Sequence, residues 1–530
     1  MAPPARLACR TCGWQGEPYS TVKPPPRALA DARHHEHGAH GPPQRLLKVG
    51  RPILGVLAIA LAVVVSAGLS SDLAVTLLSG LLILAVLRVS KWDAAAVAAL
   101  CAASLLIIPA RYSLGPFAAT PAVLVGVFAL ALWVAGKLVG RAFSWGRHPI
   151  GTSIFLFVGT VLLGYLAGHL RVLTSFEAKA ADRKMLLLLA VVGVALMLAD
   201  GVKSIARVRL VVGMIVLGGS IMASVGIVQF TTGNDIAAEL KPPGFTADTQ
   251  NLEFIAQRDG YRRVSGTAMH AIEFGVASAM ILPLAIHLAM TAQAFWARRL
   301  AVIAALLLAV AIPMSVSRSA FLAVGVIALT MLPFWPARVK WRVIAGAVAA
   351  VVVLTIASPG LISDVGSRFT NTSSDVSVQG RTSDYGPIFD FVAQSPWTGR
   401  GYGTFDAQQY FHVDNQYLIT LVETGIIGTA GLLVLLFTGP MVARRIRQAT
   451  RDPAVADLSR SLGCVVMIAI VSCATFDLFG FRIVTGLLFI SLGLLGAMYR
   501  IVHQGLGEPS PAGASAVLGH GAPHAVLERG

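Results

Sequence analysis

The run LITLVETGIIGTAGLLVLLF, residues 418–437, decides the class of fold. About 20 predominantly apolar residues, at a rise of 1.5 Å each, span the roughly 30 Å hydrocarbon core of a bilayer, and this run has that length. It follows directly on the polar interval 359–415, which separates it from the preceding apolar segment. Because a loop of that length is usually functional or disordered, we interpret it as the working part of the protein. The apolar segments around it are then the frame that holds this loop at one membrane surface.

The composition of the whole chain is that of a membrane protein. Of its 530 residues, 55% are hydrophobic and 13% are charged, whereas a soluble domain carries roughly a quarter charged residues. The formal charge of +16 usually reflects basic cytoplasmic loops in such a protein, so we predict no binding of nucleic acid. The five cysteines suggest no disulfide framework. A cleavable signal peptide is not expected, because the first long apolar run begins only near residue 53.

The hydropathy pattern predicts an all-α fold. We expect a polytopic protein of about 12–14 transmembrane helices, with a large extracytoplasmic loop that carries short helices. The candidate spans lie near 52–69, 73–88, 94–109, 121–140, 150–168, 185–200, 210–230, 268–290, 300–316, 320–336, 342–358, 417–440, 461–478 and 482–500.

Lysine and arginine recur in every second connection, and this bias predicts the orientation of the chain. It places both termini in the cytoplasm and the long polar loops 231–267 and 359–416 outside. One expected outer loop, 169–184, breaks the bias because it is basic. Its cations are Arg171, Lys179, Arg183 and Lys184.

These patterns divide the chain into regions of different character. We expect a disordered cytoplasmic tail (1–50), an N-terminal transmembrane scaffold (51–209), a transmembrane core with arginine-bearing outer loops (210–358), a large extracytoplasmic loop (359–416), C-terminal transmembrane helices (417–500) and a second disordered cytoplasmic tail (501–530). In the first tail, Cys9 and Cys12 form a C-x-x-C-G that looks like half of a zinc ribbon. One half is an incomplete signature, so we interpret this tail as solvated low-complexity sequence and predict no metal site.

Arginines mark two further polar clusters on the expected outer side. Arg262 and Arg263 lie in YRRVSGTAMHAIEFG (261–275), and Arg318 lies in SVSRSAFL (315–322), between two apolar segments. A charge so close to hydrocarbon is costly and is a functional hypothesis by default, although an arginine can also snorkel to the interface. The guanidinium group stays charged and binds phosphate oxygens through two parallel hydrogen bonds. Two or three such residues could hold a lipid-linked diphosphate and stabilise it as a leaving group.

Candidate bases lie at the end of the long loop. Asp414 could act as a general base at the membrane surface, or the Asp414–Asn415 pair could simply cap the following helix. His412 is the other candidate base. Glu423, within the following apolar run, could pair with an arginine, bind a backbone group, or be structural.

Five short motifs follow one another along the second half of the chain. They are Arg263-Val-Ser-Gly266-Thr267, Ser317-Arg318, Pro396-Trp-Thr-Gly399-Arg-Gly401-Tyr-Gly403-Thr-Phe405, Asp414-Asn415 and Glu423-Thr-Gly425-Ile-Ile-Gly428. In this order they resemble the O-antigen ligase and O-antigen polymerase superfamily of bacterial membrane glycosyltransferases, over roughly residues 210–440. The sequence departs from the family at Asp414, where the ligases usually have histidine, and at Ile272, where many members have asparagine.

The resemblance implies transfer of a glycan from a polyprenyl diphosphate, such as undecaprenyl diphosphate, to a glycan or lipid acceptor. The reaction would polymerise or ligate a cell-surface glycan outside the bacterial cytoplasmic membrane, without a metal or cofactor. Arg263 and Arg318, helped by Arg381, would bind the diphosphate, and Asp414 or His412 would deprotonate the acceptor hydroxyl. The remaining candidates, in supporting roles, are Arg262, Arg400, Asn415 and Glu423.

Two readings from other classes remain open at the level of sequence. One is a secondary transporter or flippase-like carrier, which would place ionisable groups and broken helices near the bilayer midplane. Here the polar chemistry gathers at one surface instead, which favours an enzyme. The other is a catalytically inactive partner in envelope assembly, a reading that the unusual Asp414 keeps open.

Overall fold

The computed structural model describes residues 93–114, 119–139, 148–247, 255–258, 261–357 and 385–503. The chain divides into two compact units, residues 1–88 and 89–530, and all the described residues belong to the second. Several expectations lie outside the described residues. They are both tails with Cys9 and Cys12, the candidate spans 52–69 and 73–88, and the part of the long loop that carries Arg381.

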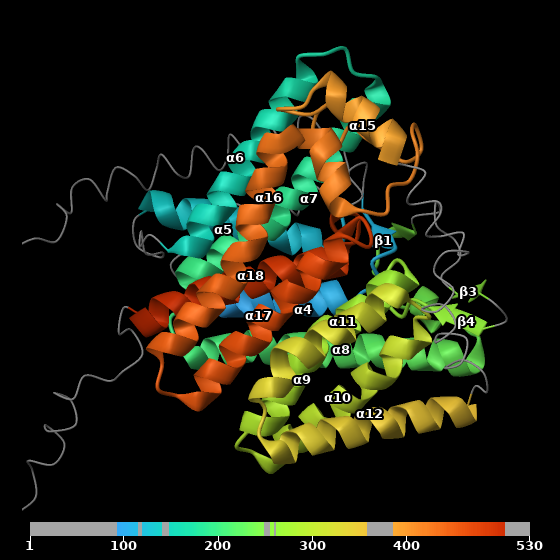
Figure 1. Cartoon of the computed structure of the whole chain (residues 1–530), viewed down its shortest axis with the longest axis vertical. Helices are drawn as coiled ribbons and strands as arrows, with labels where there is room; N and C mark the ends of the chain where they lie inside the picture. Colours follow the sequence, from blue (N-terminus) through green and yellow to red (C-terminus); the bar gives the residue numbers. More distant parts are fainter. Residues whose placement is uncertain are drawn as a thin grey trace, which may run out of the picture. The chain divides into compact units, whose positions relative to one another are not determined.

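Helices make up most of the described structure (Figure 1). They are α4 (Ala94–Ile107), α5 (Pro121–Val139), α6 (Pro149–His169), α7 (Ser175–Gly201), α8 (Ile205–Thr232), α9 (Ala271–Thr291), α10 (Phe295–Met314), α11 (Arg318–Met331), α12 (Ala337–Ala357), α15 (Tyr385–Gln394), α16 (Gln416–Ala449), α17 (Pro453–Cys473) and α18 (Arg482–His503). Three short 3₁₀ turns are η2 (Ile236–Glu239), η3 (Leu332–Phe334) and η5 (Leu478–Gly480).

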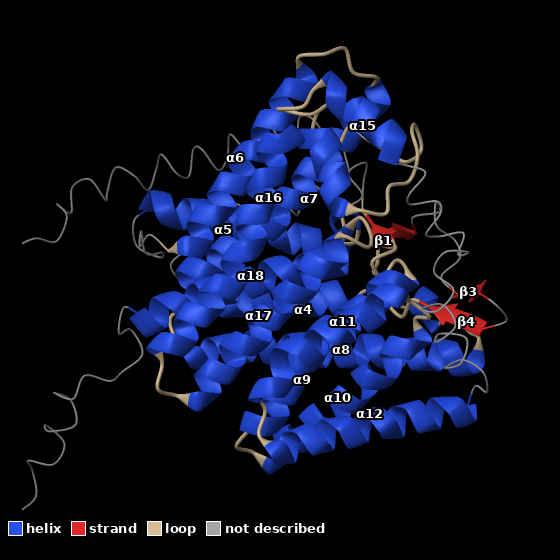
Figure 2. Ribbon diagram, in the orientation of Figure 1, coloured by secondary structure: helices blue, strands red, loops and turns tan. Residues whose placement is uncertain are grey.

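Four short strands lie in the connections between helices (Figure 2). They are β1 (Tyr112–Ser113), β2 (Thr246–Ala247), β3 (Ile255–Arg258) and β4 (Tyr261–Val264). Strand β1 pairs with β2, and β3 pairs with β4, both antiparallel. In the second pair Ala256 lies opposite Arg263, so the hairpin holds one of the predicted arginines.

Within the described residues, nine helices are long and apolar enough to cross a membrane. They are α5 to α10 and α16 to α18, while α4 and α11 are shorter apolar helices. Every candidate span that falls within the described residues overlaps a helix. The expectation of an all-α polytopic membrane protein is therefore confirmed. The physical reason is that a segment in lipid must satisfy its own backbone hydrogen bonds, which a helix does.

Two helices begin earlier than their hydropathy suggests. The expected loop 169–184 is wrong in its second half, because α7 begins at Ser175. The Thr174 hydroxyl accepts from the Glu177 amide (3.2 Å), and the Glu177 carboxylate accepts from the Thr174 amide (2.9 Å). This capping box starts the helix in polar sequence. Similarly, α17 begins at Pro453, behind the Asp452 cap, and not near residue 461.

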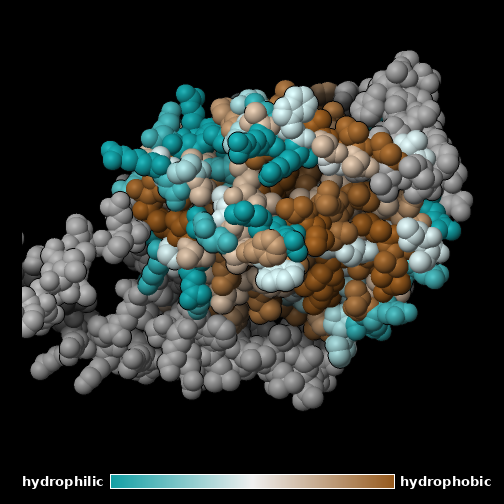
Figure 3. Space-filling model, turned by 90° about the horizontal axis from the view of Figure 1, so that it is seen from below, coloured by the Kyte–Doolittle hydropathy of each residue, from teal (hydrophilic) through white to brown (hydrophobic). Residues whose placement is uncertain are grey.

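Helix α18 lies at the centre of the unit and is almost wholly buried. It packs against α7, α17, α16, α9, α4 and α6. Helices α6, α7, α15 and α16 lie together at the top of Figure 1, whereas α10 and α12 lie at the bottom. The space-filling view from below shows a broad apolar area bordered by polar residues (Figure 3). Such an area is what a lipid-facing surface requires.

At one end of the unit, hydrogen bonds join the connections between α4 and α5, α8 and α9, α10 and α11, α15 and α16, and α17 and α18. We call this the site end, because all the described candidate residues lie there.

Candidate functional site

Arg263 and Arg318 meet the same tight turn. Arg263 lies in β4, and its Nε donates a hydrogen bond to the carbonyl oxygen of Ser315 (3.2 Å) in the connection between α10 and α11. This connection is only three residues long and contains Val316 at a φ of 46°. Arg318 is the first residue of α11. The structure thus places these two candidate arginines at one turn, while Arg381 lies outside the described residues.

The start of α11 adds a second source of positive potential at this turn. Ser317 makes no side-chain hydrogen bond to the first turn of the helix. The amide groups at a helix N-terminus carry partial positive charge and favour an anion there. Arg262 has a different position, because its guanidinium donates to the carbonyl oxygens of Phe230 (3.1 Å) and Thr231 (3.3 Å) at the end of α8. It ties β4 to that helix.

Gln229 of α8 holds the backbone that follows Arg263. Its side-chain oxygen accepts from the amide of Gly266 (2.8 Å), and its nitrogen donates to the carbonyl oxygen of the same glycine (3.2 Å) and to Asp235 (2.8 Å). Gly266 has a φ of 59°, and a Cβ there would lie 2.8 Å from the Met222 carbonyl oxygen. These contacts explain the glycine of the R-x-x-G-T motif. Sequence reasoning missed Gln229, because an isolated glutamine in an apolar run carries no motif.

The threonine of the same motif fastens this segment to α4. The Thr267 hydroxyl donates to the carbonyl oxygen of Leu106 (2.6 Å), and the Ala110 amide donates to the Thr267 carbonyl oxygen (2.8 Å). Arg111, close by, forms an ion pair with Asp235, which also accepts from Gln229. The first half of the chain therefore helps to position the arginine-bearing strand.

We expect Gln229→Leu to weaken donor use without unfolding the protein. The change leaves the buried Gly266 amide without its acceptor, which costs about 1–3 kcal/mol and releases the segment that carries Arg263. The KM for the lipid-linked donor should rise about 10-fold, with a smaller fall in kcat. Steady-state kinetics on purified protein measure both, and Thr231→Val, which removes only an exposed hydroxyl, serves as the control. Equal KM values in wild type and Gln229→Leu would exclude this positioning role.

The connection between α17 and α18 joins the other candidates to this region. Buried Glu273 of α9 accepts from the amides of Met269 (2.9 Å) and Ile483 (2.6 Å), so it fixes the start of α18 against α9. Gln416, the first residue of α16, accepts from the amide of Phe479 (2.7 Å). In the sequence this connection is only the short gap between the expected spans 461–478 and 482–500. In the structure this connection contacts both α9, which follows the arginine-bearing strand, and the start of α16, which follows the long loop.

Asn415, and not Asp414, caps α16. The Asn415 side-chain oxygen accepts from the amides of Tyr417 (3.0 Å) and Leu418 (3.2 Å). Asp414 and His412 are exposed, while Val413 between them is buried. Both candidate bases are therefore accessible at the site end, next to the start of α16.

Helix α16 is broken at Gly425, whose φ is 65° and ψ is −164°. The Pro396–Gly401 segment of the long loop closes the break through four backbone hydrogen bonds. They run from Arg400 N to Val422 O (2.9 Å), Gly401 N to Glu423 O (2.9 Å), Ile426 N to Pro396 O (2.9 Å) and Ile427 N to Trp397 O (3.3 Å). The proline–glycine motif of the loop and the E-x-G motif of the helix are therefore one structural unit.

The motif glycines are required by close backbone contacts. Gly399, Gly401 and Gly403 have φ values of 70°, 127° and 78°, a region that L-residues with a side chain rarely adopt. A Cβ on Gly399 would lie 2.3 Å from the carbonyl carbon of Glu423. A Cβ on Gly401 would lie 2.6 Å from the Cα of Gly168 in α6. The loop can approach α6 and α16 only where it has no side chains.

Arg400 anchors the loop on α7. Its guanidinium donates to the Tyr410 hydroxyl (2.8 Å) and lies 4.8 Å from the centre of the Phe391 ring. The Tyr410 hydroxyl in turn donates to the Glu177 carboxylate (3.1 Å). Glu177 is almost fully buried, and its carboxylate accepts hydrogen bonds from Thr174, Arg171 and Tyr410.

Glu423 pairs with a lysine, whereas an arginine was one of the three alternatives that the sequence left open. Lys184 Nζ lies 2.9 Å from the Glu423 carboxylate and also donates to the carbonyl oxygen of Phe405 (3.4 Å). Sequence reasoning missed this partner because of the early start of α7, which turns Lys184 from a loop residue into a residue of the helix wall. The Glu423 side chain is 3% exposed and is therefore desolvated, whereas that of Lys184 is 29% exposed.

Asp477 lies beside this ion pair and was not among the candidates. Its carboxylate accepts from the Gly480 amide (3.2 Å). The pKa of Asp477 is raised to about 6, chiefly by burial and in part by the negative charges of Glu423 and Asp414, while Lys184 and the Gly480 amide oppose the rise. Asp477 is thus a third charged group beside Lys184 and Glu423.

We expect Asp477→Asn to stabilise the protein at neutral pH and not in acid. A carboxyl group whose pKa is raised on folding makes the folded protein less stable as the pH rises. The loss develops between the group's pKa in the unfolded chain, near 4, and its pKa in the folded protein, about 6. The amide oxygen of asparagine keeps the bond to Gly480 and removes the charge. The stabilisation above pH 7 should approach at most about 3 kcal/mol and should vanish near pH 4. Thermal unfolding in detergent from pH 4.5 to 8 measures it, and a pH-independent difference in Tm would contradict the prediction.

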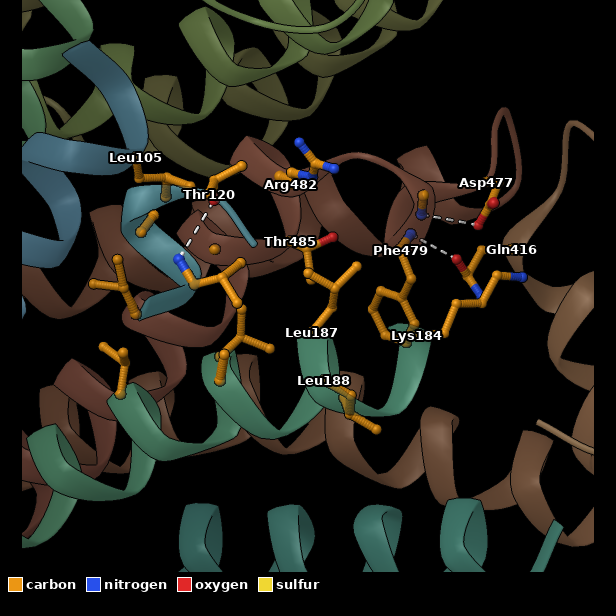
Figure 4. A pocket seen from close by; sticks show the side chains of 18 of the residues that line it. Leu105, Thr120, Lys184, Leu187, Leu188, Gln416, Asp477, Phe479, Arg482 and Thr485 are labelled. Carbon is orange, nitrogen blue, oxygen red and sulfur yellow. Dashed lines mark hydrogen bonds between the residues drawn. The ribbon is translucent and has the colours of Figure 1, made fainter. Parts of the chain in front are cut away.

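A pocket with a cavity volume of about 80 Å³ lies beside these charges (Figure 4). Its walls come from α4, α5, α7, α16, α18 and the connection that contains η5. Lys184, Gln416 and Asp477 lie together on one side of the view, and Leu105 and Thr120 lie on the other. The pocket therefore has a charged end and an apolar end.

Comparison with known proteins adds a match to the second half of the chain. Residues 303–433 match the family described as O-Antigen ligase, and no curated protein matches the chain. The matched region contains Arg318, Asp414 and Glu423, together with the loop segment that closes the break in α16. Arg263 lies before it. The resemblance to the O-antigen ligase and polymerase superfamily is thus shown over residues 303–433, which match the O-antigen ligase family.

Proposed function

We propose that this protein is a membrane glycosyltransferase that polymerises or ligates a cell-surface glycan. Its donor is a glycan on a polyprenyl diphosphate, used on the outer side of the bacterial cytoplasmic membrane, and it needs no metal. The observation that carries the proposal is the meeting of Arg263 and Arg318 at one turn, 3.2 Å from Arg263 Nε to the Ser315 carbonyl oxygen. The family match to residues 303–433 supports the reaction class.

In the proposed reaction the acceptor hydroxyl oxygen attacks the anomeric carbon of the donor sugar. The bond between that carbon and the diphosphate oxygen breaks, and the electron pair leaves with the diphosphate. Arg263, Arg318 and the start of α11 stabilise this charge, and Arg381 is proposed to assist. The hydroxyl proton passes to Asp414 or His412. Because the diphosphate is already a good leaving group, the protein mainly positions the two substrates.

The broken helix α16 does not favour a transporter. In transporters, unwound backbone groups at a helix break are left to coordinate the substrate or coupling ion. Here the loop segment Pro396–Gly401 pairs with the backbone on both sides of Gly425. The break therefore serves to hold the loop that carries the candidate bases.

The proposed function predicts different effects for the two candidate bases. Asp414→Asn should keep donor binding and lower turnover about 1,000-fold, since a positioned general base contributes roughly that much. His412→Ala should lower turnover less than 10-fold. The assay uses purified protein, a polyprenyl-diphosphate oligosaccharide and an acceptor, with released polyprenyl diphosphate and product mass as readouts. Asp390→Asn, on α15, is the control.

The opposite pattern would reassign the base. Full activity of Asp414→Asn together with loss of activity in His412→Ala identifies His412. No release of diphosphate by the wild type, across several donors and acceptors, would overturn the proposed function itself.

A further inference from the structure

Two arginines pack against one aromatic ring at the end of the helices opposite to the site end. Helix α16 begins at the site end and α17 ends there, so the end of α16 and the start of α17 lie at the opposite end. There the guanidinium carbon of Arg460 lies 4.4 Å from the centre of the Phe334 ring, and that of Arg447 lies 5.9 Å from it. Phe334, in η3, is 57% exposed. We call Arg447, Arg460 and Phe334 the far-end cluster.

Close packing of α16 on α17 brings the two arginines together. The Ser459 hydroxyl donates to the carbonyl oxygen of Ala443 (3.4 Å), and a Cβ on Gly463 would lie 2.9 Å from the Cβ of Ala443. Arg447 follows Ala443 by one turn and lies on the same face of α16, and Arg460 directly follows Ser459 in α17. The helix contact therefore keeps the two positive charges near each other.

The protein supplies little negative charge to these two cations. Among the residues that the structure describes, Arg447 makes no hydrogen bond or ion pair and Arg460 makes no hydrogen bond. Arg460 Nη1 lies 3.7 Å from the Asp457 carboxylate, beyond the length of a hydrogen bond. The other oxygen of that carboxylate lies 2.7 Å from His287 Nδ1. One carboxylate, shared with a histidine, thus partners only one of the two arginines.

Two like charges held near one ring repel each other, and partial burial strengthens this repulsion. The Arg460 side chain is 18% exposed, and that of Arg447 is half-buried. The face of an aromatic ring attracts a cation, but the ring has no net charge and leaves the repulsion in place. A bound anion removes it. Phosphate suits guanidinium groups, because its oxygens accept parallel hydrogen bonds from them.

Further cations surround the far-end cluster. Lys340 Nζ donates to the carbonyl oxygen of Pro333 (3.4 Å), directly before Phe334, and Arg444 is exposed one turn before Arg447 on α16. Basic sites between transmembrane helices at the cytoplasmic surface bind the head groups of anionic lipids. The distribution of lysine and arginine predicts that this end faces the cytoplasm.

From this geometry we infer that the far-end cluster is a binding site for a phosphate group. The phosphate belongs to the head group of an anionic phospholipid or to a soluble phosphate, and in either case it bridges Arg447 of α16 and Arg460 of α17. The cluster contains none of the residues proposed for glycan transfer, so the inference does not depend on the proposed function.

Thermal unfolding of the full-length protein in a nonionic detergent and a phosphate-free buffer tests the site. Phosphatidylglycerol should raise the Tm of the wild type by about 3 °C at saturation, whereas a diacylglycerol with the same chains, which lacks the phosphate, should not. Arg447→Gln should lose this gain. Arg209→Gln, which removes an exposed arginine at the start of α8, should keep it.

The same variant separates a ligand site from a structural contact. Without phosphate, Arg447→Gln should be at least as stable as wild type, since it relieves repulsion from Arg460 and breaks no hydrogen bond among the described residues. The gain on adding phosphatidylglycerol decides, whatever the absolute Tm. An equal gain in wild type and Arg447→Gln overturns the inference. If Arg447→Gln does not fold, Phe334→Leu takes its place, because it removes the ring that holds both guanidinium groups and keeps their charges.

Inorganic pyrophosphate identifies the source of the phosphate. A gain in Tm that depends on Arg447 and appears with phosphatidylglycerol, but not with pyrophosphate, assigns the site to a lipid head group. The reverse pattern assigns it to a soluble phosphate. Native mass spectrometry checks the lipid directly, and Arg447→Gln should weaken its binding about 10-fold. No gain that depends on Arg447 from either compound rejects the site.

Discussion

Arg318→Ala is expected to lower glycan transfer about 1,000-fold, since removal of one preorganised charge donor from a developing anion costs about that much in other enzymes. Arg318 begins α11, at the turn whose Ser315 carbonyl oxygen accepts from Arg263. Its loss removes charge and hydrogen-bond donors at the position proposed for the leaving diphosphate. Release of polyprenyl diphosphate by purified protein measures the effect.

Two variants separate the role of Arg318 from a general effect of charge. Arg318→Lys keeps the charge but not the planar fork, and it should recover only part of the lost rate. Arg338→Ala removes an exposed arginine at the opposite end of the helices and should keep the full rate. Wild-type turnover by Arg318→Ala, in protein of unchanged Tm, would remove Arg318 from the diphosphate site.

Gly399→Ala is expected to destabilise the protein by about 4 kcal/mol and to abolish transfer. At a φ of 70° the new side chain is strained, at a cost of about 1–2 kcal/mol. Its Cβ also lies 2.3 Å from the carbonyl carbon of Glu423, so the loop must withdraw from α16. The backbone bonds from Arg400 and Gly401 to α16 would then be lost, at about 1 kcal/mol each. Thermal unfolding in detergent measures the change in Tm.

Gly159→Ala is the matched control for this substitution. Gly159 lies inside α6, and a Cβ there would meet nothing within 4 Å. Alanine is the better helix former by about 1 kcal/mol, so this variant should be as stable as wild type or more so. A Tm for Gly399→Ala equal to that of wild type would show that the loop does not need its close contact with α16.

Hydropathy predicted the transmembrane helices well, because lipid leaves a spanning segment little choice but a helix. Hydropathy failed at the helix ends, where polar residues continue the helix. Helix α7 begins at Ser175, after a capping box that a hydropathy scale does not detect. That failure hid the partner of Glu423. Lys184 and Glu423 are 239 residues apart, and no local pattern links them.

The motifs predicted which residues form the candidate site but not the contacts that hold those residues in place. Arg263 and Arg318 stood out in the sequence as cations near apolar segments. Gln229 and Asp477 did not, since each acts through a contact with a distant backbone group or charge. Glycines in a long loop are typical of backbone conformations that other residues rarely adopt. Only the structure shows that this backbone pairs with the break at Gly425.

The segment Pro396–Gly401, which closes the break in α16, is synthesised before that helix. A helix that entered lipid with an open break at Gly425 would expose unpaired amide and carbonyl groups, at a cost of several kcal/mol each. Because the closing segment precedes the helix in the chain, it leaves the ribosome first and is tethered nearby when the helix inserts. The order of the motifs, glycine-rich loop first and broken helix second, therefore makes the closing segment available when the helix inserts. A circular permutant that reverses it would have to insert the break unprotected.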